Sequence, residues 1–233
     1  MRKFFQVGFL LTIGIVVACS RRPTSSDPQA VAETTYHGRR IAPTMSFLGA
    51  EWLEREDRVE TERPDEVIAA LKIPEGAVVA DIGAGTGFFT LRLARRVGAS
   101  GKVIATDLQP EMLALLRQHA GEAGLANIEP VLCTERDAKL PVDAVDLALM
   151  VDVYHELSHP EETMAQVRRA LRAKGRLVLV EYRGEDPSVP IKPEHKMTLA
   201  QLKSELEPMG FRLQETLEFL PQQHLVVFVK AEN

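Results

Sequence analysis

The sequence predicts an α/β fold, in which a mainly parallel sheet is doubly wound by helices on both faces and ends in an antiparallel hairpin. Three observations predict it. A short apolar run beginning at Val78 leads into the glycine-rich turn of VVADIGAGTG. Strand-like and helix-like segments then alternate as far as residue 180, which is typical of a parallel sheet with right-handed crossovers. Two strand-like runs close the chain, at 211–219 and 224–229, and are near enough to pair as a hairpin.

The N-terminal 35 residues are expected to lie outside the folded domain. A basic start at residues 1–3 precedes an apolar run that ends at Cys19, a pattern typical of an export signal and short for a membrane-spanning helix. The sequence VVAC resembles the lipobox of bacterial lipoproteins, and this resemblance implies lipidation of Cys19. An uncleaved anchor and an incidental apolar N-terminus are the alternatives. Residues 20–35 are polar and aperiodic, so they are predicted to form a disordered tether.

This N-terminal pattern predicts location as well as structure. If residues 1–19 act as a lipoprotein or export signal, the protein is expected in the cell envelope, held at the membrane through its N-terminal anchor. If the signal is not used, the protein is expected in the cytoplasm.

Residues 36–63 are expected to form a lid over the domain. The stretch from Ser46 to Asp57 has helical spacing through Phe47 and Trp52. Pro64 fits the first position of a helix that is broken by Pro74-Glu75-Gly76. The domain proper is therefore placed at 64–233.

The elements of the domain follow in order along the chain. We expect strands at 78–80, 102–106, 127–133, 144–151 and 176–180 before the two hairpin strands, and helices at 88–97, from 110 to about 121, at 160–173 and from 198 to about 207. Pro130 predicts an edge position for its strand, because proline cannot donate to a sheet ladder. The strand at 144–151 is almost wholly apolar, which indicates burial on both faces. Thr198 and Gln201 form a capping box.

Composition narrows the function classes. The chain is 45% apolar and 26% charged, which suits one globular domain with an N-terminal extra piece. Its 28 basic and 33 acidic residues give a formal charge of −5 without a long run of either sign, so nucleic acid is not an expected partner. The two cysteines, Cys19 and Cys133, lie in no metal-binding pattern, so we expect no disulfide framework and no metal site. The sequence carries no signal for an oligomeric state.

The glycine turn predicts a ligand site. Without Cβ atoms at Gly83, Gly85 and Gly87, the backbone can adopt positive φ and approach a bound molecule closely. The spacing is GxGxG, and Phe88 stands where the dinucleotide fingerprint has its third glycine, which disfavours NAD. Asp107 follows Gly87 by twenty residues and can accept hydrogen bonds from both hydroxyls of a ribose. An adenosine moiety is therefore the expected ligand.

Four segments carry a resemblance to a known family. VADIGAGTG, IATDLQPEML, LPVDAVDLALMVDVYHEL and GRLVLVEY resemble the motifs of class I S-adenosylmethionine-dependent methyltransferases of the small-molecule type, with a type 11 or type 25-like domain. The resemblance covers residues 64–230 and implies a Rossmann-like, seven-stranded sheet with S-adenosylmethionine as cofactor. It implies contacts to the methionine part by Asp81 and the backbone of Gly83 and Gly85 in the turn that Gly87 completes, to the ribose by Asp107, and to the adenine by Leu108. Near the adenine amine it implies an acid, for which Asp137 and Glu135 are the alternatives.

The acceptor side is predicted from two other segments. Tyr154 and His155 follow the strand at 144–151, where substrates of this fold approach the methyl group, and His155 is suited to act as a general base. The alternative is that His155 only shapes the pocket or caps a helix. The proline-rich and charged loop at 183–197 is the predicted substrate loop, with His195 and Lys196 as contacts. A solvated loop without a role is its alternative.

The expected function is methyl transfer to a small or amphipathic acceptor. VDVYHEL lacks the Asp/Asn-Pro-Pro-aromatic motif of nucleic-acid amine methyltransferases, and Cys133 alone does not supply the cysteines of arsenite methylation. The alternative from another class is a non-catalytic, membrane-anchored binding protein that keeps the fold. The export signal motivates it, because S-adenosylmethionine is made in the cytoplasm. Nicotinamide-dependent oxidoreduction is disfavoured by Phe88.

Overall fold

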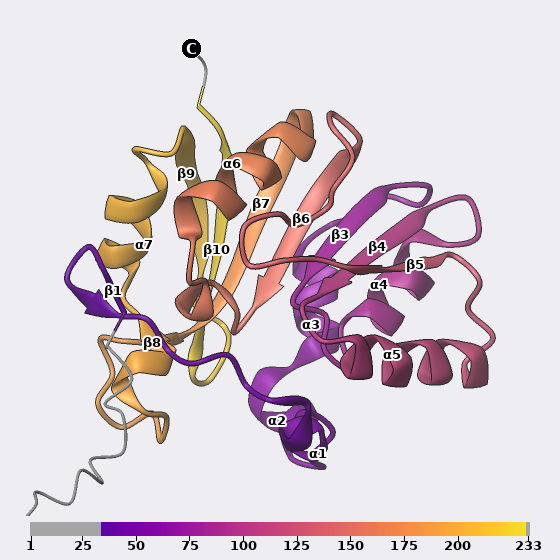
Figure 1. Cartoon of the computed structure of the whole chain (residues 1–233), viewed down its shortest axis with the longest axis horizontal. Coiled ribbons are helices and arrows are strands. Elements are labelled where there is room, and N and C mark those ends of the chain that lie inside the picture. The colour runs from indigo at the N-terminus through magenta and orange to yellow at the C-terminus, as the bar shows by residue number, and fades with distance from the viewer. Residues whose placement is uncertain (1–33, 232–233) are drawn as a thin grey trace, which may run out of the picture. The chain divides into compact units, whose positions relative to one another are not determined.

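The fold is known from a computed structural model, which describes residues 34–231. The predicted signal at 1–19 with Cys19, and nearly all of the predicted tether at 20–35, lie outside these residues. Figure 1 shows a central sheet with helices on both faces, which confirms the predicted α/β fold class. Within the described range, no helix is both long enough and apolar enough to cross a bilayer.

The elements begin with a short N-terminal part. It contains strands β1 (Thr35–Tyr36) and β2 (Arg39–Arg40), the 3-10 helix η1 (Phe47–Gly49), and helices α1 (Ala50–Leu53) and α2 (Arg58–Glu62). The other helices are α3 (Pro64–Ala70), α4 (Thr90–Val97), α5 (Pro110–Glu122), η2 (Tyr154–Glu156), α6 (Pro160–Ala170), η3 (Pro193–His195) and α7 (Leu199–Leu206). The strands are β3 (Val78–Ile82), β4 (Lys102–Asp107), β5 (Ile128–Leu132), β6 (Val145–Val151), β7 (Leu171–Arg183), β8 (Lys196–Met197), β9 (Phe211–Leu217) and β10 (Gln223–Lys230).

The sheet has the order β5-β4-β3-β6-β7-β10-β9. Strands β3 to β7 pair in parallel, whereas β10 is antiparallel to both β7 and β9, which confirms the terminal hairpin. Strand β5, which contains Pro130, lies at one edge as predicted. A two-residue strand that the sequence did not predict, β8, pairs in parallel with the end of β7.

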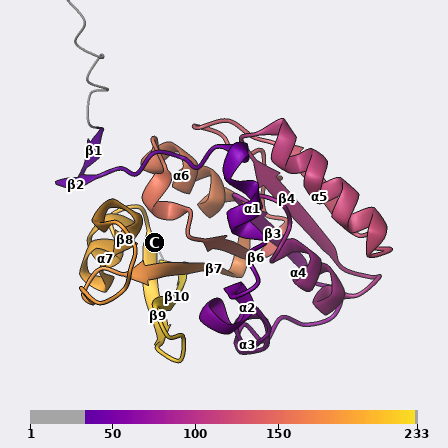
Figure 2. The same ribbon diagram turned by 90° about the horizontal axis from the view of Figure 1, so that it is seen from below.

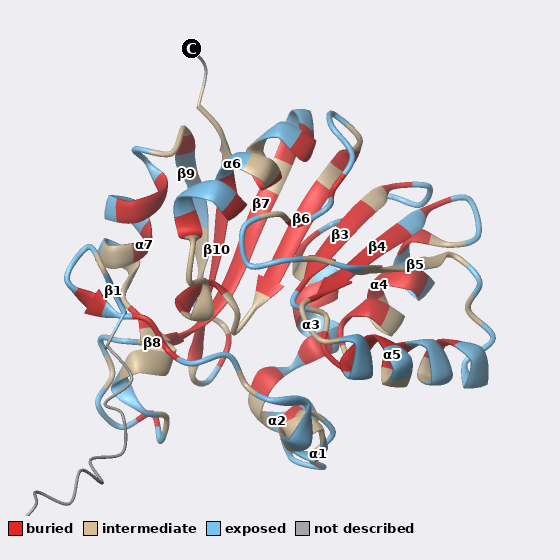
Figure 3. Ribbon diagram, viewed as in Figure 1, coloured by how far each residue is buried: buried red, intermediate tan, exposed pale blue. Residues whose placement is uncertain are grey.

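Two large hydrophobic clusters pack against the sheet, and Figures 2 and 3 show the helices that cover it and the buried residues along its central strands. Helices α6 and α7 contribute Met164, Val167 and Leu202 to the cluster on one face. Helices α3 and α4 contribute Val67 and Leu93 to the cluster on the other face, and α5 packs against β4 and β5. Because both faces are covered, the central strand β6 is apolar and buried along nearly its whole length.

Local sequence signals predicted the starts of two helices correctly and the end of one helix wrongly. Pro64 occupies the first turn of α3, and Thr198 and Gln201 form the predicted capping box of α7. The helix predicted at 160–173 was wrong in length, because α6 ends at Ala170 and β7 begins at Leu171. Gly175, which was interpreted as the helix stop, lies within β7 at an irregularity in its pairing with β6. A Cβ at Gly175 would lie 2.9 Å from the carbonyl oxygen of Val145, so the close approach of the two strands requires glycine there.

Candidate functional site

A cavity of about 610 Å³ lies at the carboxyl ends of the parallel strands. Its volume falls within the range of about 300–1,000 Å³ that is typical of small-molecule sites. The wall comes from the glycine turn after β3, the ends of β4 and β6, the N-terminal segment around Met45 to Arg58, and the loop that precedes β8. Of the predicted site residues, Gly83, Gly85, Asp107, Leu108, His155 and His195 line this cavity.

The glycine turn brings backbone to the cavity where side chains would not fit. Gly83 and Gly85 have φ values of +70° and +54°, in the left-handed region that favours glycine. A Cβ at Gly83 would lie 2.5 Å from a methyl carbon of Val153, and one at Gly85 would lie 2.9 Å from Leu53 Cδ1. The turn therefore offers a backbone surface to a ligand. Gly87 does not line the cavity and instead packs against α5.

Asp107 lies at the end of β4, beside that turn. Its Oδ2 accepts a hydrogen bond of 2.9 Å from the Gly85 N–H, and its Oδ1 accepts one of 2.9 Å from the Gln109 N–H. Burial raises the pKa of Asp107, and these hydrogen bonds oppose that rise. A carboxylate has about four lone-pair sites, so each oxygen retains capacity for a further donor. The arrangement fits the predicted recognition of two ribose hydroxyls.

Asp81 lies behind the cavity wall rather than in it. Its side chain is buried, and its Oδ2 accepts a hydrogen bond of 2.5 Å from the Thr90 hydroxyl. Burial raises the pKa of Asp81 to about 6, against the opposing effect of the Thr90 hydrogen bond. In this geometry Asp81 supports the base of α4, and a contact between its side chain and the cofactor stays a prediction.

We expect Asp81→Asn to change how stability depends on pH. A carboxyl whose pKa is about 6 in the folded chain and about 3.9 when unfolded binds more protons in the folded state between those values. The wild type therefore loses up to about 3 kcal/mol of stability as pH rises from 4 to 7. Asp81→Asn lacks this titrating group, and its side-chain oxygen can still accept a hydrogen bond from the Thr90 hydroxyl. Urea unfolding at several pH values measures the difference, with the exposed Asp65→Asn as control; parallel curves for Asp81→Asn and wild type would contradict it.

The acid expected near the adenine amine has two candidates, and the structure separates them. Glu135 lines the cavity, as do Thr134 and Ala138. Asp137 is not part of the wall: its carboxylate binds the ammonium of Lys139 at 2.7 Å. The turn from Thr134 to Asp137 directs these two acids differently, which sequence spacing did not reveal.

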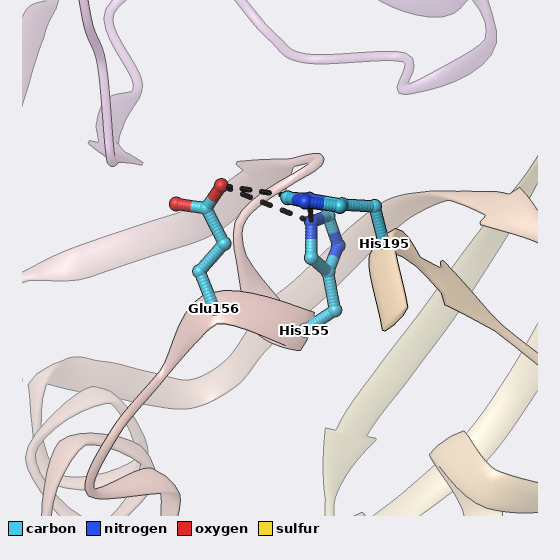
Figure 4. Close-up of side chains that lie close together, drawn as sticks. All are labelled: His155, Glu156 and His195. Carbon is cyan, nitrogen blue, oxygen red and sulfur yellow. Dashed lines mark hydrogen bonds and ion pairs between the residues drawn. The ribbon is translucent and has the colours of Figure 1, made fainter. Parts of the chain in front are cut away.

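His155 faces the cavity from η2, opposite His195 on the loop between β7 and β8 (Figure 4). The side chain of Glu181, on β7, lies 2.5 Å from His155 Nδ1 and also accepts the N–H of Tyr154 at 2.8 Å. His155 Nε2 lies 3.2 Å from His195 Nδ1. Burial lowers the pKa of His155, but the neighbouring carboxylates of Glu181, Glu156 and Asp152 together outweigh burial, and the net shift is upward. Burial and the neighbouring His155 lower the pKa of His195.

Tyr154 and Lys196 do not reach the cavity. The Tyr154 hydroxyl is fully buried and donates to Glu205 Oε2 on α7 at 3.0 Å. Glu205 also pairs with Arg39, whose Nη1 donates to the carbonyl of His155 at 3.1 Å. The ammonium of Lys196 donates to the carbonyls of Asp186 and Val189, so it holds the loop closed on itself. Both side chains thus support elements of the site.

The N-terminal segment lies across the carboxyl end of the sheet (Figures 1 and 2). Gln109 ties it down, because its amide donates to the carbonyl of Met45 at 2.9 Å and accepts the N–H of Phe47 at 2.7 Å. Arg58 stacks over Phe88 at 4.1 Å. The stretch at 46–57, for which helical spacing was predicted, forms η1 and α1, followed by turns before α2. Pro43, Met45 and Trp52 line the cavity from this segment, as a lid would.

Three acidic residues in or beside the site were not singled out from the sequence. Glu156 and Asp152 line the cavity, and burial raises the pKa of Glu156 to about 7. Asp152 accepts from the Gln223 amide at 2.8 Å, and burial raises its pKa well above the ordinary value. Glu181 is fully buried against His155. The segments VDVYHEL and GRLVLVEY contained all three, but contacts across the sheet decide their roles.

Comparison with known proteins points to the same chemistry as the geometry. Residues 79–175 match the family described as a methyltransferase domain, Methyltransf_25. Two curated relatives are named ubiquinone/menaquinone biosynthesis C-methyltransferase UbiE. The one from Hahella chejuensis is 32% identical over 117 residues, which cover 50% of this chain and 46% of that protein. The one from Paraburkholderia phymatum is 30% identical over 116 residues, covering 49% and 47%. The chain thus spans about half the length of these relatives.

A solved structure extends the likeness over more of the chain. A SAM-dependent methyltransferase from Aquifex aeolicus aligns with a TM-score of 0.75 at 27% identity, covering 79% of this chain and 98% of that one. The residues at the glycine turn and at Asp107 fit S-adenosylmethionine, since they offer close backbone and a carboxylate for a ribose without a phosphate cradle. Residues 79–175 are therefore similar to a methyltransferase domain, and the described residues share the fold of a SAM-dependent methyltransferase.

Proposed function

We propose that this chain transfers a methyl group from S-adenosylmethionine to a small or amphipathic acceptor. The observation that carries the proposal is the continuity of the cavity. Gly83, Gly85 and Asp107 line the same cavity as His155 and His195, so a nucleoside and an acceptor would share one space.

The contribution of the protein is positioning and exclusion of water. S-adenosylmethionine supplies a methyl group on an already activated sulfonium. Asp107 and the backbone of Gly83 and Gly85 fix the nucleoside end, while Met45 and Trp52 of the lid cover the cavity. Holding two reactants in line in an enclosed site accounts for a large part of the barrier reduction in a displacement of this kind. His155 is proposed to contact the acceptor, and this role does not require it to act as a general base.

The acceptor end favours an amphipathic molecule. Leu157, Pro190 and Ile191 supply apolar surface, and the histidines supply polar contacts. The relatives named for ubiquinone and menaquinone C-methylation are consistent with a ring-bearing apolar acceptor. The family match ends at residue 175, before the loop that carries His195, so it gives no information on that loop. The acceptor proposed is therefore a class and not a named quinone.

Cofactor binding and turnover test the proposal. The purified full chain is expected to bind S-adenosylmethionine or its demethylated product with micromolar affinity by calorimetry and thermal shift. Incubation with methyl-labelled cofactor and an organic extract of cells is expected to move label into the extract. Binding of NAD in place of S-adenosylmethionine would overturn the proposal, and cofactor binding with no label transferred from any extract would favour a non-catalytic binding protein.

We further propose that the chain is held at the membrane by lipid on Cys19, which the lipobox-like sequence supports. Metabolic labelling with a fatty acid in a bacterial host is expected to mark the wild type and to fail in Cys19→Ser. Cys133→Ser serves as the matched control, because burial raises the pKa of the Cys133 thiol to about 11 and so disfavours its thiolate. Label retained in Cys19→Ser would contradict the anchor.

A further inference from the structure

Three metal-ligating atoms converge at the acceptor end of the cavity (Figure 4). His155 Nε2 lies 3.2 Å from His195 Nδ1, and Glu156 Oε1 lies 3.9 Å from each of these nitrogens. All three residues line the cavity. We propose that His155, Glu156 and His195 bind a divalent transition-metal ion of the Zn²⁺ class.

The separations suit such an ion. A zinc ion binds nitrogen at about 2.0–2.1 Å, so two ligands at a tetrahedral angle are about 3.3 Å apart. The two histidine nitrogens already lie at 3.2 Å. The carboxylate oxygen of Glu156, at 3.9 Å from each nitrogen, is roughly half an ångström farther away than this geometry needs. Its side chain extends from the end of η2 on rotatable bonds, which can close this gap. Two histidines and one carboxylate are a recurrent ligand set that leaves coordination positions open.

Glu181 provides the outer contact that such a site requires. Its carboxylate lies 2.5 Å from His155 Nδ1, so this nitrogen can donate its proton to Glu181 while Nε2, 3.2 Å from His195 Nδ1, binds the ion. Ligating histidines commonly donate their second N–H to a carboxylate, which fixes the tautomer and the ring. Glu181 is itself fixed, because it is fully buried and accepts the backbone N–H of Tyr154.

The position of the site suggests what the ion would do. Because its three ligands line the cavity, its open coordination positions would face that cavity. A borderline ion in this position would take an oxygen donor, so the acceptor would carry a hydroxyl or carbonyl group near the carbon or oxygen that is methylated. This last step rests on the proposed function, whereas metal binding itself does not.

Without a metal, His155 and His195 would form only a histidine pair. The experiment must therefore distinguish a metal site from such a pair. The full chain, without a histidine tag, is stripped with a chelator and titrated with Co²⁺ and then Zn²⁺. We expect one ion per chain, with the visible absorption of Co²⁺ in a nitrogen and oxygen site and displacement by Zn²⁺. Mg²⁺, which prefers oxygen ligands, is expected not to compete. Absence of stoichiometric binding would overturn the proposal.

Variants locate the ion. His195→Gln and Glu156→Gln are expected to weaken binding at least about tenfold, while His37→Gln, an exposed histidine outside the cluster, leaves it unchanged. Glu181→Gln acts as a positioning variant and is expected to weaken binding by about 10–100-fold without removing a ligand. His155→Gln is informative only if circular dichroism shows that it folds, so the two other ligand variants decide the matter. Equal binding in His195→Gln, Glu156→Gln and wild type would place the ion elsewhere and overturn the assignment.

Cofactor affinity, measured in the same variants, distinguishes a failure of the metal-site proposal from a failure of the proposed function. Among the described residues, the metal ligands form no hydrogen bond with Asp107 or with the glycine turn, so His195→Gln and Glu156→Gln are expected to bind S-adenosylmethionine within about threefold of wild type. Metal binding without cofactor binding would refute the proposed function alone. Cofactor binding without metal binding would refute the metal site alone.

Discussion

Replacing Asp107 with alanine is expected to weaken the binding of S-adenosylmethionine at least about 100-fold. Each hydrogen bond to a charged group contributes about 1.5–3 kcal/mol, and the proposed contact is to two ribose hydroxyls. The loss of even a part of both corresponds to two orders of magnitude, since every 1.4 kcal/mol is tenfold in affinity. Asp107 also accepts the Gly85 N–H, so its removal loosens the turn that faces the ligand. Isothermal titration calorimetry on the full chain measures the change.

Two controls make this result specific. Asp65→Ala removes an acid whose side chain is 82% exposed on α3, and it is expected to leave affinity unchanged. Asp107→Asn keeps the size of the side chain but places an amide N–H₂ near the N–H groups of Gly85 or Gln109, so an intermediate loss is expected. Affinity of Asp107→Ala within threefold of wild type, in a folded protein, would contradict the assignment of the ribose to this carboxylate.

The fold was predictable because its signals are local and repeated. The alternation of apolar strands with helical runs, Pro130 at an edge and the Thr198 capping box each agree with the structure. The exceptions are short or irregular. The two-residue strand β8 has no periodicity to detect, and Gly175 looks like a helix stop although it relieves a close approach between β6 and β7.

The candidate site was predictable only for residues whose position follows from their place at the end of a parallel strand. The ends of parallel strands lie at one edge of the sheet, so Gly83, Asp107 and His155 meet at the cavity. Neighbouring residues in a 3-10 helix point in different directions, and Tyr154 is turned toward α7 while His155 faces the cavity. The partners of His155 come from β7 and from the loop before β8, and no sequence spacing connects them to η2.

Glu205→Ala is expected to destabilise the protein by about 3–5 kcal/mol, the usual cost of breaking a buried ion pair from one side. Glu205 is 1% exposed, and its carboxylate accepts from Arg39 Nε at 2.8 Å and Nη2 at 3.1 Å. The variant leaves a buried guanidinium unpaired and removes the acceptor of the Tyr154 hydroxyl. For a domain of this size the melting temperature is expected to fall by about 6–20 °C. Thermal and urea unfolding measure both.

The matched comparison is an exposed pair of similar geometry. Lys102 and Glu129 lie 2.9 Å apart with about half of each side chain exposed, so Glu129→Ala is expected to cost no more than about 1 kcal/mol. The double variant Arg39→Met with Glu205→Leu removes both charges and is expected to recover most of the lost stability. A cost for Glu205→Ala no larger than that for Glu129→Ala would show that the buried pair contributes little.

This pair also links stability to the site. Arg39 Nη1 and the Ala42 N–H both donate to the carbonyl of His155, so the segment before the lid is fastened to η2 through the same arginine that Glu205 holds. If that link matters for function, Glu205→Ala should weaken metal binding at His155 at temperatures well below its melting point, while cofactor affinity at Asp107 stays near wild type. Equal losses of metal affinity and cofactor affinity would instead indicate general loosening of the fold, because Arg39 reaches the site through the carbonyl of His155.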